Sequence, residues 1–128
     1  MTSFGCFLAE PNELRCEFQN SDYYMLDEVY GCYAGNQGDV ILDRANKKIQ
    51  TISAVYEESR TNADVNFVEI WNSKVFYFPQ LQNNFKNLEA IAIYSSKLKE
   101  SRKVDLNPFP KLRHLRLPFN DLEVIESG

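Results

Sequence analysis

One short phrase occurs twice in this chain, and the same spacing of apolar residues follows each copy. Phe85-Lys86-Asn87-Leu88 is matched by Phe109-Pro110-Lys111-Leu112. A weaker copy without the phrase begins at Val65, so the copies start at residues 65, 88 and 112, which are 23 and 24 residues apart. A fixed period of about 20–29 residues is typical of stacked units, each of which buries its apolar face against the next.

The apolar residues occupy the first, fourth, sixth and eleventh positions of each copy: Val65, Val68, Ile70, Val75; Leu88, Ile91, Ile93, Leu98; Leu112, Leu115, Leu117, Leu122. The ninth position holds Ser73, Ser96 or Asn120, where a short polar side chain can bond backbone groups of a turn. This is the leucine-rich-repeat template. Residues 61–128 are therefore predicted to form a leucine-rich-repeat solenoid of the α/β type with a short parallel sheet, its last unit truncated. Chance periodicity in an ordinary α/β domain is the alternative, and the paired phrases argue against it.

Residues 1–60 do not show the spacing. The segments 14–18 and 29–33 alternate as strands do, residues 34–38 are rich in turn formers, and 49–55 is typical of a further strand. We expect residues 1–60 to form an N-terminal antiparallel β cap. Such a cap would cover the apolar residues and the free sheet edge of the first unit.

The charge and hydropathy of the chain argue against some classes of function. The net charge of −4 does not suggest general nucleic-acid binding. No apolar run approaches the roughly 18 residues that span a bilayer, and Met1–Glu10 lacks the cationic and apolar parts of a signal peptide. The chain is therefore either cytosolic or preceded by a signal that lies upstream of this sequence.

The chain has three cysteines, an odd number. Cys16 and Cys32 flank a segment that could fold back as a hairpin, and a bridge closing it would add about 3 kcal/mol in the chain-entropy model. Cys6 is left over. It is either a buried or free thiol, or it pairs with a partner outside this sequence or in another molecule.

In each copy, the residues between the inward-facing positions lie on the opposite side of the strand, because side chains alternate across a strand. Aromatic residues gather on this concave side: Phe67, Trp71, Tyr94 and Phe119. Exposed aromatics most often carry interface binding energy, which favours a binding face. Alternatively, the rings cover small neighbours such as Ala90 and Ala92, or pack on the cap.

The charge of the same face changes along the chain, from Glu69 and Glu89 to Arg113, His114 and Arg116. This step could steer an acidic partner to the C-terminal side, or it could be a solvated charged surface. The predicted binding residues are Phe67, Glu69, Trp71, Tyr94, Arg113, His114, Arg116 and Phe119.

Catalytic and cofactor motifs are absent from the sequence. His114 is the single histidine and has no second ligand at metal-binding spacing. No nucleophile elbow, phosphate-binding loop or dinucleotide fingerprint occurs. We therefore expect no enzyme activity, no metal site and no cofactor.

The N-terminal half adds a resemblance. Cys16-Glu17-Phe18 followed by Val29-Tyr30-Gly31-Cys32, then Thr61-Asn62-Ala63-Asp64-Val65, and later Phe76-Tyr77-Phe78-Pro79 are similar to motifs of a group of secreted insect leucine-rich-repeat proteins of midges and mosquitoes. The match covers about residues 14–126. It implies a secreted, non-catalytic binding module with a Cys16–Cys32 disulfide.

The chain departs from that group at three points: it shows no signal peptide, Cys6 has no counterpart, and the sequence stops inside the third copy, whereas members of the group are longer. We therefore expect a fragment of a longer array. If the chain is complete, its last unit leaves an edge that should pair with another chain, giving a homo-oligomer.

These observations predict a protein-recognition module that binds its partner on the concave face. A self-associating structural scaffold is the first alternative. An intracellular repeat adaptor, with Cys16 and Cys32 reduced in the cytoplasm, is the second.

Overall fold

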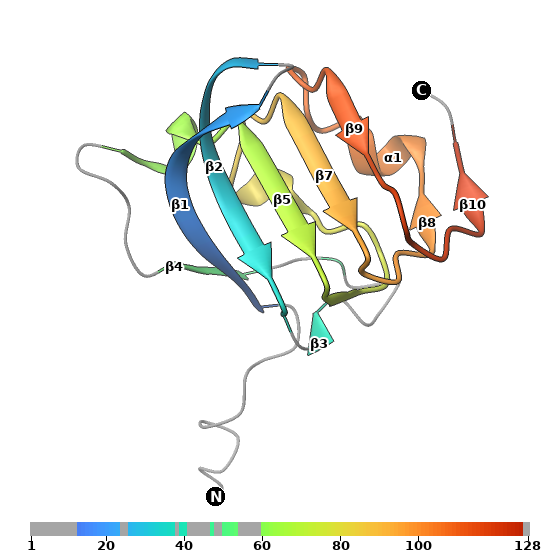
Figure 1. Ribbon diagram of the computed structural model, residues 1–128. Helices are drawn as coiled ribbons and strands as arrows, with labels where there is room; N and C mark the ends of the chain where they lie inside the picture. The colour runs from blue at the N-terminus through green and yellow to red at the C-terminus, as the bar shows by residue number, and fades with distance from the viewer. Residues whose placement is uncertain are drawn as a thin grey trace, which may run out of the picture.

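The computed structural model (Figure 1) describes residues 13–23, 26–37, 39–40, 47, 50–53 and 60–126. Cys6 lies outside the described residues, and so do residues 54–59. The proposed division of the chain at residue 60 stays a prediction.

One mixed six-stranded sheet forms the body of the molecule, with strand order β4-β1-β2-β5-β7-β9. Its strands are β1 (Glu13–Tyr23), β2 (Leu26–Gly35), β4 (Gln50–Ser53), β5 (Phe67–Trp71), β7 (Ala90–Tyr94) and β9 (His114–Arg116). β1 and β2 pair antiparallel, and all other neighbours in this sheet are parallel. Figure 1 shows β2, β5, β7 and β9 side by side with the same direction.

Short elements connect the main strands. β3 (Asp39–Val40) pairs with β6 (Lys74–Val75), and β8 (Glu100–Ser101) pairs with β10 (Val124–Ile125). Turns of 3₁₀ helix occur at Asn62–Asp64 and Leu81–Asn83, and α1 (Lys103–Leu106) has four residues. None of the described helices has the length and hydropathy needed to cross a membrane.

Polar side chains support the turns that follow the parallel strands. Ser73 Oγ accepts a hydrogen bond from Gln37 N at 2.9 Å, and Ser96 Oγ accepts one from Ser73 N at 3.2 Å. Asn120 Oδ1 accepts from Ser96 N at 2.9 Å. The prediction that these short polar side chains bond turn backbone is confirmed, and the series connects β2 with β5, β7 and β9.

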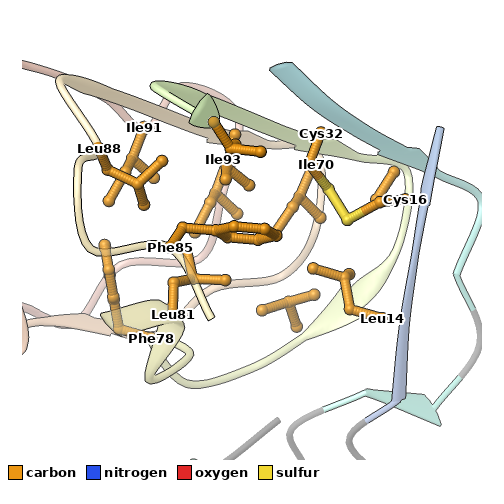
Figure 2. Packing of buried hydrophobic residues seen from close by; sticks show 14 of the residues in the cluster. Leu14, Cys16, Cys32, Ile70, Phe78, Leu81, Phe85, Leu88, Ile91 and Ile93 are labelled. Atoms are coloured by element: carbon orange, nitrogen blue, oxygen red, sulfur yellow. A yellow bond between two sulfur atoms is a disulfide. The ribbon is translucent and has the colours of Figure 1, made fainter. Parts of the chain in front are cut away.

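The larger of the two apolar clusters among the described residues, called the core below, lies on one face of the main sheet. The predicted inward-facing residues from Val65 to Leu98 are all buried, whereas Leu112, Leu115, Leu117 and Leu122 are partly buried. Phe85 and Phe109, which lie between the strands, are buried in the same core. Figure 2 shows the Phe85 ring in the middle of the cluster, between leucine and isoleucine side chains.

The predicted bridge between Cys16 and Cys32 is present. The cysteines face each other across β1 and β2 with a Cα–Cα distance of 4.9 Å, and both are buried at the edge of the core (Figure 2). Phe18 extends this edge of the core, since its ring packs against Phe85 with centroids 6.1 Å apart.

The predicted fold class is wrong. The chain is not an α/β-type leucine-rich-repeat solenoid with a separate antiparallel β cap. It is a mostly-strand fold in which the N-terminal strands and the later strands share one mixed sheet and contribute to the same apolar core.

Two physical reasons account for the difference. The backbone edge of β2 would be unsatisfied if it ended a cap, so it pairs in parallel with β5, Gly31 opposite Phe67. The two segments that follow β5 and β7 also form no long helix: the first holds β6 and one 3₁₀ turn, and the second holds β8 and the four-residue α1.

Candidate functional site

The face of the main sheet opposite the core carries the residues predicted to bind. Strand pairing arranges this open face in two lateral rows of side chains. The first row is Glu17, Tyr33, Glu69, Ala92 and Arg116, and the second contains Gly35, Trp71 and Tyr94. Side chains that are far apart in the sequence therefore lie on neighbouring strands.

The β1–β2 hairpin covers one end of the open face. Leu26 and Val29, near the start of β2, belong to the same buried cluster as Ala90 of β7, two strands away. In Figure 1 this end of the hairpin curves over the sheet. Phe67 lies beneath it at 3% exposure and packs edge-on against Tyr33, with ring centroids 5.8 Å apart. Phe67 is therefore a packing residue and not an accessible contact.

Trp71 and Tyr94 remain half-buried beyond the covered end. Their rings are nearly parallel, with an interplanar angle of 14° and centroids 6.4 Å apart. Trp71 lies directly against the backbone of β2, since a Cβ at Gly35 would be only 2.4 Å from Cε2 and Cζ2 of the indole. Glycine at position 35 is therefore what lets the indole rest on the sheet.

The stacked rings separate two hollows. The first, of about 550 Å³, is lined by Arg15, Cys16, Glu17, Tyr33, Gly35, Asn36, Gln37 and Trp71. The second, of about 290 Å³, is lined by Glu69, Ala92, Tyr94, Arg116, Pro118 and Phe119. Trp71 contributes to one hollow and Tyr94 to the other, so the pair forms an aromatic ridge between them.

Glu69 is the most perturbed acid of the open face. Burial raises the pKa of its carboxyl, while hydrogen bonding from the Tyr94 hydroxyl and the charge of Arg116 act in the opposite direction. The pKa of Tyr94 is raised as well, by burial first and then by the nearby negative charge of Glu69. Ala92 stands between Glu69 and Arg116 in the row, and its small side chain leaves the space of the second hollow open.

Phe119 stands at the rim of the second hollow and is 83% exposed. Its backbone is left-handed, with φ 59°, as it is at Asn36, Asn72 and Ser95 after the preceding strands. Asparagine tolerates this region, whereas a bulky residue there is uncommon. Neither burial nor backbone preference therefore explains a phenylalanine at this position.

The predicted residues do not all come together. Glu69, Trp71, Tyr94, Arg116 and Phe119 surround the ridge and the second hollow. His114 begins β9 and Arg113 directly precedes it, and neither residue lines either hollow.

The Arg113 guanidinium is engaged within the fold. Its Nη2 is 3.0 Å from Glu89 Oε1, in an ion pair on the surface. The predicted charge step is thus partly neutralised by the protein itself.

The first hollow was not predicted from the sequence. Apart from Trp71 of β5, its residues come from β1, β2 and the turn after β2, which do not show the repeated spacing. One signal was available: Tyr33-Ala34-Gly35-Asn36 aligns with Glu69-Ile70-Trp71-Asn72, and the structure pairs the first three residues of each segment.

The site offers contact area and hydrogen-bonding groups. In the described part of the chain, no three His, Cys, Asp or Glu side chains come together as ligands for a metal ion. Two hollows beside a half-exposed aromatic pair are suited to bind a ligand by burial and hydrogen bonding.

No protein-family model, no curated protein and no solved structure matches the chain. The resemblance to secreted insect proteins stays a prediction, supported by the residues that carry it.

Proposed function

We propose that the chain is a non-catalytic recognition module that binds a protein partner on its open face, around Trp71 and Tyr94. The observation that carries the proposal is the aromatic ridge between two hollows. Tryptophan and tyrosine are the residues that most often dominate interface energies, above all where they are surrounded by contacts that exclude water.

The exposure and the backbone conformation of Phe119 also support binding at the open face. A phenylalanine that is 83% exposed in a left-handed conformation costs stability and gains little burial. Such outliers cluster at functional sites. A partner that covers Phe119 would bury the surface that the free protein leaves exposed.

The module is proposed to act outside the cell. The Cys16–Cys32 disulfide supports this, since disulfides persist in oxidising compartments and are rare in the cytosol. Mass mapping of the native protein without reduction tests the compartment. Free thiols at both positions would support the intracellular adaptor instead.

The binding face is tested by capture of partners from the extracellular fluid of the source organism. The double variant Trp71→Ala, Tyr94→Ala should lose partners that the wild type retains, although it still folds and melts in one cooperative transition. Val104→Ala is the matched control, because Val104 is a 65% exposed apolar residue of α1 that lines neither hollow. Equal capture by the double variant and the wild type would contradict the proposal.

A second candidate is self-association through β9. β9 is an outer strand of the main sheet, and the apolar residues nearest to it are only partly buried, whereas Ile91 and Ile93 of β7 are at most 1% exposed. Edge strands with uncovered apolar residues tend to pair with another chain. Light scattering across a concentration series tests this candidate: a mass that stays at one chain excludes it.

A further inference from the structure

We infer that the ligand of the open face is a proline-rich segment of the partner in the polyproline II conformation. This inference rests on the proposed function. It adds which conformation the partner presents and how that conformation fits the two hollows.

The spacing of the hollows is the first argument. Tyr33 lines the first hollow and Ala92 the second, and their strands, β2 and β7, are separated by β5. Two strand spacings amount to about 9.6 Å. A polyproline II helix repeats every three residues with a rise of about 3.1 Å, so side chains i and i+3 share one face about 9.3 Å apart. A β-strand places same-face side chains about 6.8 Å or about 13.6 Å apart, which fits less well.

Hydrogen-bond donors on the open face are the second argument. The side chains of Arg15 and Arg116 and the indole N–H of Trp71 form no hydrogen bond or ion pair with any other described residue. A polyproline II segment has no internal hydrogen bonds, so its carbonyl groups are free to accept, and its prolines bring no N–H that needs a partner. Aromatic-lined grooves recognise such segments in general.

Charge is the third argument. Each hollow has one guanidinium and one carboxylate: Arg15 with Glu17 in the first, and Arg116 with Glu69 in the second. A phosphate-rich ligand would meet a carboxylate in both places. The balanced charges favour a neutral backbone rich in acceptors, which matches the proline-rich segment.

The test uses two libraries of displayed ten-residue peptides. One library has proline at positions i and i+3 with all other positions varied, and the other has alanine at those two positions. We expect enrichment from the proline library alone. Trp71 is the single tryptophan of the chain, so its fluorescence reports directly on the ridge when a selected peptide is titrated.

Substitutions test whether the selected peptide binds at the aromatic ridge or elsewhere on the surface. Tyr94→Ala should weaken binding of the selected peptide at least tenfold by calorimetry, and Arg116→Gln should weaken it less. Val104→Ala should leave the affinity unchanged. If Tyr94→Ala fails to fold, Phe119→Ala takes its place, because the exposed Phe119 side chain contributes little to the core.

The outcomes distinguish this inference from the function it rests on. Equal enrichment from both libraries, or from neither, overturns the polyproline inference. If a folded partner is still captured and the capture depends on Trp71, the proposed protein recognition holds although the polyproline inference fails. Quenching of Trp71 by neutral oligosaccharides, with no peptide or protein bound, overturns both.

Discussion

Phe119 allows a sharp test of whether an exposed aromatic residue is kept for binding or for stability. We consider two replacements: alanine, which removes the ring and keeps a Cβ, and asparagine, which removes the ring and tolerates the left-handed backbone. The observed φ of 59° and the exposure of 83% set the expected magnitudes.

The burial contribution is small. A phenylalanine buries about 150–250 Å² when it is fully enclosed, and about one sixth of that is buried here. At about 25 cal/mol per Å², the loss on truncation is about 0.6–1 kcal/mol. The left-handed backbone costs about 1–2 kcal/mol for a residue with an ordinary Cβ, and asparagine relieves part of it. Phe119→Ala should therefore lower the free energy of unfolding by about 0.6–1 kcal/mol. Phe119→Asn should leave it unchanged or raise it by up to about 1 kcal/mol.

Urea denaturation followed by Trp71 fluorescence measures these differences. Phe85→Ala is the matched reference, since Phe85 is 0% exposed and its truncation should cost about 3–5 kcal/mol. Partner capture should fall in both Phe119 variants. A loss of more than about 2 kcal/mol for Phe119→Asn exceeds any burial estimate and would show that Phe119 is needed for stability.

Three further predictions concern the disulfide, the partly buried Glu69 and the contact between Gly35 and the indole of Trp71. Reduction of Cys16–Cys32, 16 residues apart, should lower the free energy of unfolding by about 3 kcal/mol in urea with the third thiol blocked, and a loss below about 1 kcal/mol would contradict the chain-entropy estimate. Burial raises the folded-state pKa of Glu69 above its ordinary 4.5, so the stability of the wild type relative to Glu69→Gln should be greatest at low pH and should fall as pH rises from 4.5 towards the raised value. Urea titrations at about pH 4 and about pH 7 measure this difference, and a constant difference would speak against it. Gly35→Ala would place a Cβ 2.4 Å from the ring of Trp71, so the ring should move, its fluorescence maximum shift and partner binding weaken; an unchanged spectrum would show that the indole does not rest on Gly35.

Local features of the protein were predictable from the amino-acid sequence alone. Alternation along a strand depends only on neighbouring residues, so the burial of Val68, Ile70, Ile91 and Ile93 could be predicted. The polar side chains at the turns were predictable for the same reason. The Cys16–Cys32 bridge followed from a resemblance, because spacing alone left the pairing open.

How these parts combine depends on strand pairing between distant segments. β2 pairs in parallel with β5, and nothing local in the sequence states the partner or the direction of a strand. That pairing merged the expected cap with the later strands and overturned the predicted fold class.

The candidate site depends on the same non-local pairing. Gly35 lies opposite Trp71 only because β2 and β5 are neighbours, and Phe67 is buried in a cluster to which Leu26 and Val29 of the hairpin contribute. Trp71 and Tyr94 could therefore be predicted from the sequence as contacts with a partner. The accessible surface around them depends on which strands pair with each other. The periodicity of the sequence does not specify this pairing.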